Sequence, residues 1–168
     1  MIEGQAIVPA FDRYRFRGEF LDCFASIENH SAPVLKRLVE LGQAKKAPHL
    51  FGQKFDLILK AANLERLWLH RQHVGEILEG LRPFAELRGL VCHAIIESAV
   101  VGGFPAIALK PPGNNDWQAR KLLTEDEAAS LLAELRRLTA KLLKQGLVAN
   151  VSPPSSPPPP SLAATNGP

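Results

Sequence analysis

Apolar residues recur at helical spacing over most of the chain. Between Gly18 and Gly42 they follow one another at steps of three and four residues, which places them on one face of an α-helix. We therefore predict a helix over 18–42, ended by Gly42 because glycine readily adopts the left-handed conformation found after helices. Pro33 interrupts the run, so it either kinks this helix or begins a second one with Ser31 as its N-cap. The other positions of the apolar face are Phe20, Phe24, Ile27, Val34, Leu35 and Leu38.

The same spacing continues after a basic loop at 43–49. Apolar side chains at helical intervals predict helices over 50–62, 63–80 and 83–93. The second of these ends in a glycine turn, and the third begins at Pro83, a residue that suits the first position of a helix.

The clearest helix begins after Thr124. Thr124 and Glu127 form a capping box, in which the side chain of each residue bonds the backbone N–H of the other. An apolar stripe then continues to Gly146, which ends the helix. The stripe consists of Ala128, Leu131, Leu132, Leu135, Leu138, Leu142 and Leu143.

Two short runs between the fourth predicted helix and the last have a different pattern. Residues 95–101 and 104–109 are apolar or β-branched, and only Gly102 and Gly103 separate them. Two glycines between such runs predict a β-hairpin with a two-residue turn.

Together these elements predict a fold that is mainly all-α, a bundle of four to five helices with a small β-hairpin before the last helix. The chain has 168 residues, of which 46% are hydrophobic, and this suits one globular core. Seven of its 14 prolines fall in the last 17 residues, which therefore build no core. We predict a lead-in of strand or loop over 1–16, a helical domain over 17–147 and a disordered Pro-rich tail over 148–168.

Charge and cysteine content exclude several classes of protein. The formal net charge is +3, with 20 basic residues scattered among 17 acidic ones, so no dense basic patch marks a dedicated nucleic-acid binder. This charge still permits RNA or a nucleotide as a ligand. Cys23 and Cys92 lie far apart, which indicates neither a zinc site nor a disulfide framework. The N-terminus lacks the pattern of a signal peptide, and the apolar stretch 94–109 is interrupted and too short to span a membrane. We therefore predict a cytoplasmic protein without a membrane contact.

Two charged residues fall on faces that should be apolar. With Phe20 set at zero on the helical wheel, Glu28 lies at about 80°, inside an apolar stripe that extends to about 140°. Arg88 is flanked on both sides of its wheel by apolar residues of the predicted 83–93 helix. A buried arginine needs a partner, and a carboxylate matches its planar guanidinium. We therefore predict an Arg88–Glu28 ion pair, which either holds two helices in register or belongs to a polar site between them.

Arg88 also begins a short motif. His93 follows it after four residues, at the point where the predicted helix passes into a strand. This R-x4-H pattern resembles the signature of HEPN domains, helical domains whose R-x4-6-H motif carries ribonuclease activity in many members. The arrangement of helices over 18–147 is similar as well, although only the motif residues match as sequence. The residue after the arginine is commonly polar in that family, and here it is Gly89.

The resemblance implies a metal-independent endoribonuclease, or a degenerate relative that binds RNA, without a cofactor. Histidine suits general acid or base work near neutral pH, and an arginine can hold a phosphate and stabilise its transition state. Arg88 and His93 are therefore the candidate catalytic residues, with Glu28 in a supporting role. On one regular helix the two side chains point about 140° apart. Either the helix ends between them or two chains combine their motifs, and the resemblance implies the second case, a homodimer with facing motif helices.

A second hypothesis is a non-catalytic helical interaction module or scaffold, for instance one bound to a cognate partner protein. In that case the Arg88–Glu28 pair is structural and His93 caps its helix, favoured by the helix dipole.

Three further features remain. Arg66 to His73 is another match to the motif, with six residues between. His70 and His73 have metal-ligand spacing but no acidic or Cys ligand in the same turn, so we predict no metal. Trp117 either covers the core or stacks on a base.

Overall fold

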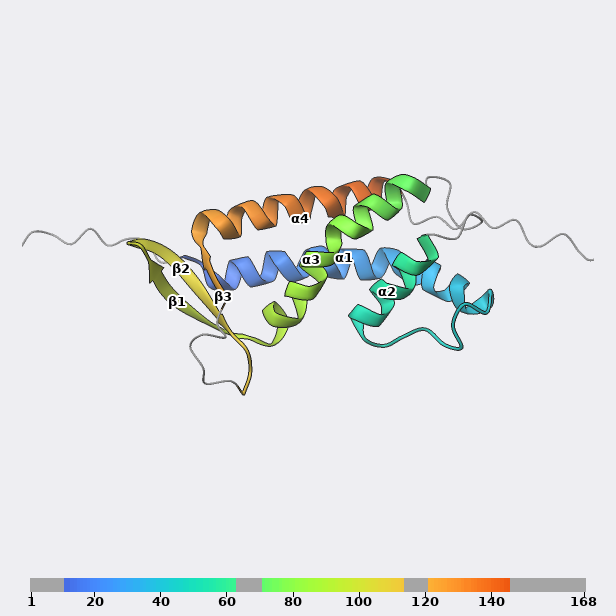
Figure 1. Cartoon of the computed structure of the whole chain (residues 1–168), viewed down its shortest axis with the longest axis horizontal. Coiled ribbons are helices and arrows are strands. Elements are labelled where there is room, and N and C mark those ends of the chain that lie inside the picture. The colour runs from blue at the N-terminus through green and yellow to red at the C-terminus, as the bar shows by residue number, and fades with distance from the viewer. Residues whose placement is uncertain (1–10, 63–70, 114–120, 146–168) are drawn as a thin grey trace, which may run out of the picture.

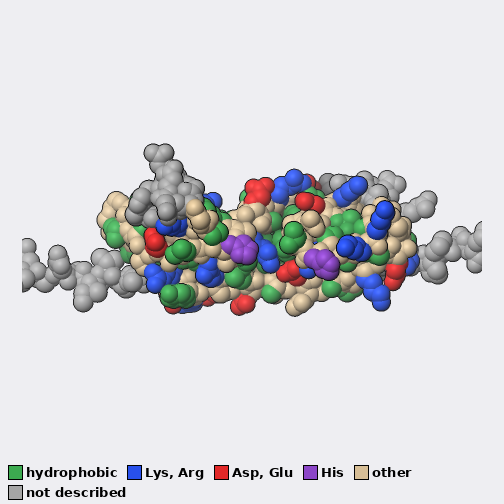
Figure 2. Space-filling view, turned by 90° about the horizontal axis from the view of Figure 1, so that it is seen from below, with side chains coloured by type: hydrophobic (Ala, Val, Ile, Leu, Met, Phe, Trp, Pro, Cys, Tyr) green, Lys and Arg blue, Asp and Glu red, His purple; other side chains and the backbone are tan. Residues whose placement is uncertain are grey.

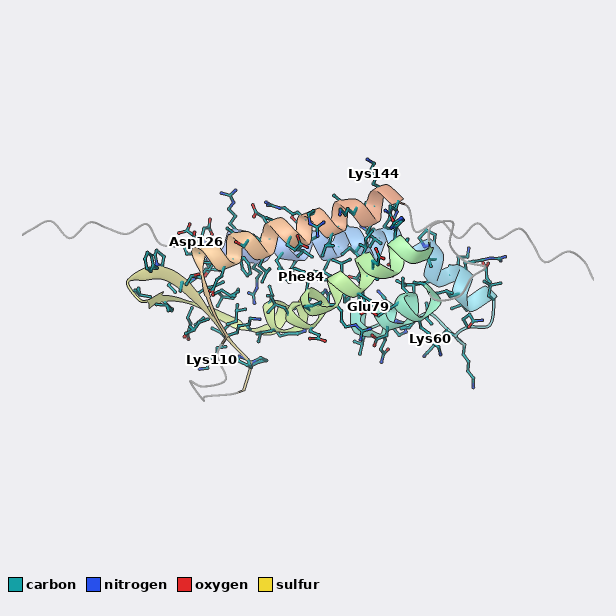
Figure 3. All side chains as sticks on the ribbon, turned by 45° about the horizontal axis from the view of Figure 1, so that its top comes forward. Lys60, Glu79, Phe84, Lys110, Asp126 and Lys144 are labelled. Carbon is teal, nitrogen blue, oxygen red and sulfur yellow. The ribbon has the colours of Figure 1, made fainter. Side chains whose placement is uncertain are left out.

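The computed structural model describes residues 11–62, 71–113 and 121–145. Figure 1 shows α1 and α4 lying side by side, with α3 crossing them diagonally and the sheet at one end of the helices. Figure 3 shows Asp126 at the end of α4 nearest the sheet and Lys144 at the other end. The prediction of a mainly helical fold is confirmed, and the sheet has three strands where a hairpin of two was predicted. In chain order the described elements are α1 (Arg13–Glu40), α2 (Phe51–Ala62), α3 (Arg71–His93), β1 (Ile95–Val101), β2 (Phe104–Lys110), β3 (Lys121–Thr124) and α4 (Glu125–Gln145).

The first helix begins earlier than predicted. Asp12 is its N-cap, and the Asp12 carboxylate accepts a hydrogen bond of 2.9 Å from the backbone N–H of Arg15. The predicted lead-in over 1–16 is therefore wrong from Arg13 onward. The predicted stop is correct, because the helix ends at Glu40 and Gly42 adopts a φ of +72°.

Both internal prolines lie within continuous helices. Pro33 neither ends α1 nor begins a second helix, and Pro83 lies inside α3, which also runs through the predicted glycine turn at Gly80. A proline leaves the carbonyl four residues before it without a partner. Pro33 and Pro83 are exposed, and so are Asn29 and Glu79, so water can satisfy the carbonyls that lose their bonds. The described parts of the predicted helices 63–80 and 83–93 are consequently one helix.

A row of phenylalanines forms the centre of the core. Phe16, Phe20 and Phe24 follow each other along α1, with ring centroids 5.9 Å and 5.3 Å apart. The edge of one ring meets the face of the other where Phe24 contacts Phe51 of α2, at 5.1 Å. Apolar side chains of α3 and α4 pack against the same cluster. The predicted apolar face of the first helix is thus confirmed as buried.

The hairpin forms as predicted, and a third strand joins it. Gly102 and Gly103 both have positive φ, and Val101 pairs with Phe104 across the turn. The sheet order is β1-β2-β3, all antiparallel, and β3 was not predicted. The capping box is confirmed, because the backbone N–H of Thr124 donates to Glu127 at 2.8 Å and the N–H of Glu127 donates to the Thr124 hydroxyl at 3.3 Å.

Several predictions fall on residues outside the described ranges. These are the N-terminal part of the lead-in, Arg66, His70, Trp117 and the Pro-rich tail. Among the helices of the described ranges, none is long and apolar enough to cross a lipid bilayer.

Candidate functional site

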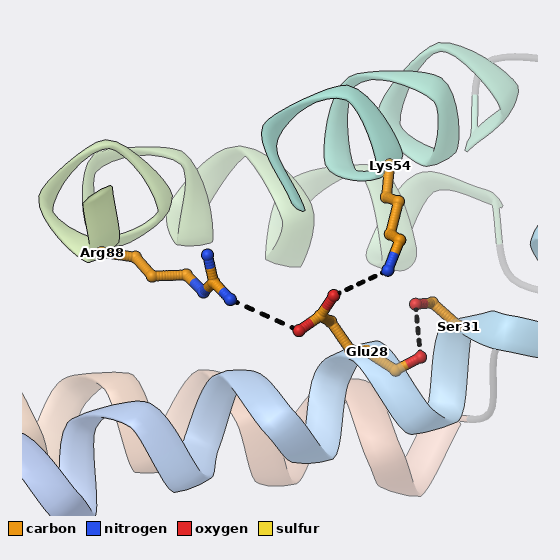
Figure 4. A network of polar contacts seen from close by, with 4 residues as sticks. All are labelled: Glu28, Ser31, Lys54 and Arg88. Carbon is orange, nitrogen blue, oxygen red and sulfur yellow. Dashed lines mark hydrogen bonds and ion pairs between the residues drawn. The ribbon is translucent and has the colours of Figure 1, made fainter. Parts of the chain in front are cut away.

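Glu28 links three helices through its carboxylate (Figure 4). One oxygen accepts a hydrogen bond of 2.9 Å from the ammonium of Lys54 on α2. The other oxygen lies 3.4 Å from Nη2 of Arg88 on α3. The predicted contact between Arg88 and Glu28 is therefore confirmed, but the shorter contact belongs to Lys54, a residue that the sequence analysis did not single out.

The guanidinium of Arg88 packs on aromatic rings. Its central carbon lies 4.4 Å from the ring centroid of Phe51 and 5.9 Å from that of Phe24, within the range of a cation–π contact. Nε of Arg88 is buried and makes no hydrogen bond to the described residues. The side chain as a whole keeps a quarter of its surface exposed, so Arg88 is partly rather than fully buried on this face. The aromatic rings explain how an arginine fits on an apolar face, because they accept its flat cation.

His93 is the last residue of α3, and its side chain is exposed. It makes no hydrogen bond or ion pair with the rest of the described chain. Because α3 continues unbroken from Arg71 through His93, the helix does not end between Arg88 and His93. A separation of five residues on a regular helix turns the two side chains about 140° apart. Within one chain the two candidate catalytic residues therefore do not converge on one point.

Arg17 holds the end of α3 and was missed by the sequence analysis. Its guanidinium donates to the backbone carbonyls of Val91 at 2.9 Å, Cys92 at 3.4 Å and Ala94 at 2.5 Å. These carbonyls flank His93 on both sides, and the last carbonyls of a helix lack partners within the helix. The helical wheel that places Glu28 on the apolar face of this helix also places Arg17 there. With Phe20 at zero, Arg17 lies at about 60°, on the same apolar face.

The other candidate residues form no site in the described chain. His73 is exposed and lies 3.8 Å from Glu76, and no group of three metal-ligating side chains occurs among the residues described. Cys23 is half-buried, and this burial raises the pKa of its thiol, which disfavours the reactive thiolate. Among the described residues, His73 therefore has too few neighbouring ligands to hold a metal, and burial argues against a nucleophilic Cys23.

The surface carries both signs of charge. On the face shown in Figure 2, basic side chains are interspersed with acidic and hydrophobic ones, and histidines lie among them. This agrees with the small net charge of +3. A ligand that binds this face is therefore held by local contacts with a few side chains rather than by a broad positive field.

The site thus combines a cation that packs on an aromatic ring with an exposed imidazole at a helix end. The chain matches no family model, no curated protein and no solved structure.

Proposed function

We propose that this protein is a metal-independent endoribonuclease of the HEPN type, in which Arg88 holds a phosphate and His93 transfers protons. The observation that supports the proposal is the set of contacts that Arg88 makes. Its guanidinium packs on the ring of Phe51, and its contact with the Glu28 carboxylate is long. The shorter contact of that carboxylate is with Lys54. An arginine oriented in this way keeps N–H groups for an anionic ligand.

The proposed reaction needs no metal. The 2′-hydroxyl of RNA attacks the adjacent phosphorus, the bond to the 5′-oxygen of the next nucleotide breaks, and a cyclic phosphate forms. His93 accepts the proton of the attacking hydroxyl or donates one to the leaving oxygen. Arg88 stabilises the charge that develops on the phosphorane. Because the two side chains diverge on α3, the proposal requires Arg88 of one chain to act with His93 of a second chain, as the family resemblance implies.

Cleavage of RNA in the presence of EDTA tests the proposal. Wild-type protein should cleave, and His93→Ala should lose at least 100-fold in rate, about the contribution of one acid–base group. His49→Ala is the control, since His49 is an exposed loop histidine outside both motif matches. Loss of activity in His73→Ala instead would assign the chemistry to the second match. No cleavage by wild type, or full cleavage by a folded His93→Ala, contradicts the proposal.

The second candidate function is a non-catalytic helical interaction module. It is favoured by the contacts of Arg88 with Glu28 and Phe51, which join three helices, and by Gly89 in the place of a polar residue. A Cβ added at position 89 would meet no atom within 4 Å outside its own stretch of helix. Gly89→Asn therefore restores the family pattern without a clash at its Cβ. If that variant cleaves RNA and wild type does not, the protein is a degenerate relative; if neither cleaves, the interaction module stands.

A further inference from the structure

The strand β1 lies at one side of the described sheet and carries three exposed large apolar residues, Ile95, Val100 and Val101. Among the described strands, β1 pairs only with β2, so its other side is an edge. Val100 is 73% exposed and Ile95 is 55% exposed. The strand contains no proline and no lysine, the residues with which proteins commonly protect an edge from other chains. An edge of this kind is suited to pair with another strand.

Exposed apolar side chains occur on all three strands of this small sheet. In the described part of the chain, five of the eight exposed large apolar residues belong to the sheet. Isolated exposed apolar residues are common, but a group in one small sheet marks an interaction surface. The five are Ile95, Val100, Val101, Phe104 and Leu122.

The hairpin determines which backbone groups point outward. In a hairpin with a two-residue turn, the pair that flanks the turn is hydrogen-bonded, and bonded pairs alternate with non-bonded pairs along the strands. Val101 and Phe104 are that flanking pair. The N–H and C=O groups of Ile96, Ser98 and Val100 therefore point away from β2, toward the free edge.

We propose that a second copy of this chain pairs with β1, antiparallel and centred on Ser98. In this register Ser98 faces Ser98 of the second copy, and Ile96 and Val100 face each other across the twofold axis. The outward backbone groups of all three residues then bond to one another. Branched side chains also lie opposite branched side chains in the outermost pairs, Ile95 with Val101, which is a favourable cross-strand combination.

The neighbouring registers fit less well. Centring the pair on residue 97 brings Glu97 opposite Glu97, and like charges directly opposite each other destabilise a sheet. Centring it on residue 99 leaves Ile95 without a counterpart in the strand. The register centred on Ser98 places Glu97 opposite Ala99 and uses all seven residues of β1.

Arg13 gives the interface a salt dependence. Its guanidinium lies 3.4 Å from the Ser98 hydroxyl, so the register centred on Ser98 brings two Arg13 cations near the axis. Salt screens such a repulsion. Dimerisation should therefore strengthen as salt concentration rises, and Arg13→Gln should strengthen it at low salt.

This interface is separate from the ribonuclease proposal. His93 precedes β1, so antiparallel pairing places the two His93 residues at opposite ends of the paired strands. The β1 contact therefore does not build a cleft from two motifs, and it stands or fails independently of RNA cleavage.

Hydrogen exchange of backbone amides, measured against protein concentration, tests the proposal. The amides of Ile96, Ser98 and Val100 should become protected over the concentration range in which sedimentation shows a dimer. Val100→Lys should abolish both the dimer and that protection. Leu50→Lys is the matched control, because Leu50 is 66% exposed but lies away from the sheet, and it should leave both unchanged.

Three outcomes would overturn the proposal. Protection of these amides that is independent of concentration would mean that another part of the same chain covers the edge. A dimer that survives Val100→Lys would lie on a different surface. A protein that stays monomeric at every salt and protein concentration would have no such interface. Ser98→Pro, which removes an outward N–H, provides a second variant that should also be monomeric.

Discussion

At the scale of single residues, the carboxylate of Glu28 contacts two cations at different distances. Lys54 makes the shorter contact and Arg88 the longer one, but only Arg88 also packs on an aromatic ring. The carboxylate therefore has two cations around it, and the loss of one cation leaves it paired. The consequences of removing each partner should differ for this reason.

Arg88→Ala should lower the free energy of unfolding by about 1–2 kcal/mol, mainly through the lost contact with Phe51. Glu28→Ala should cost more, because it leaves both cations without their carboxylate. Urea unfolding of the two variants and of Lys54→Ala measures this order. An Arg88→Ala variant as stable as wild type would show that the pair contributes nothing to the fold.

Arg17 acts on the backbone around His93 rather than on the imidazole. Arg17→Gln should lower the free energy of unfolding by about 2 kcal/mol and speed amide exchange in the last turn of α3, since several carbonyls lose a charged donor. Arg15→Gln is the control, because Arg15 lies on the same helix and its side chain forms an exposed pair with Glu19. Equal exchange rates in Arg17→Gln and wild type would contradict this role.

At the scale of elements, α4 begins with a reciprocal cap, whereas α1 begins with a simple one. The Thr124 backbone N–H and hydroxyl both donate to the Glu127 carboxylate and lower its pKa. A carboxylate whose pKa is lowered by folding contributes stability above its unfolded pKa, and this contribution is lost as pH falls through the folded value. The cap therefore makes the start of α4 sensitive to acid.

Thr124→Ala should cost about 1 kcal/mol at neutral pH, as is usual for the loss of a cap. Glu127→Ala should lower the melting temperature at neutral pH, and the difference from wild type should shrink at pH values below the ordinary glutamate pKa of about 4.3. Melting curves from pH 7 to pH 3 measure it. Glu125→Ala is the control, because Glu125 lies in the same first turn and has no such bond to the described residues. A difference in melting temperature that stays constant across this pH range would contradict the role of the Glu127 carboxylate in the cap.

At the scale of the whole molecule, the two proposals place a second chain on separate surfaces, one on the helices and one on the sheet. The family resemblance implies contact between motif helices, whereas the exposed apolar residues favour contact between β1 strands. The motif at the end of α3 is followed directly in sequence by β1. Antiparallel pairing of two β1 strands nevertheless places the motifs of the two chains at opposite ends of the paired strands.

Val100→Lys should therefore leave the rate of RNA cleavage per chain unchanged while it removes the strand-paired dimer. Parallel measurement of cleavage and sedimentation at one protein concentration tests this. A loss of cleavage together with the dimer would mean that the β1 contact holds the active assembly, and it would connect two proposals that the geometry separates.

The local features of this protein could be predicted from neighbouring residues. Helical periodicity, the Gly102-Gly103 turn and the capping box at Thr124 depend on residues close in sequence, so they could be predicted. The pairing of Arg88 with Glu28 could also be predicted, because an arginine on an apolar face needs a carboxylate partner and Glu28 lies on the apolar face of another helix.

The remaining features depend on contacts between residues that are far apart in the chain. The continuity of α1 through Pro33 depends on whether the freed carbonyl faces water, which the placement of neighbouring helices determines. The contacts of Lys54 and Arg17 join residues 26 and more than 70 positions apart, and β3 pairs with β2, which does not directly precede it in the chain. Such contacts depend on how the helices pack, and a periodic pattern shows which face is buried but not which residue lies opposite it.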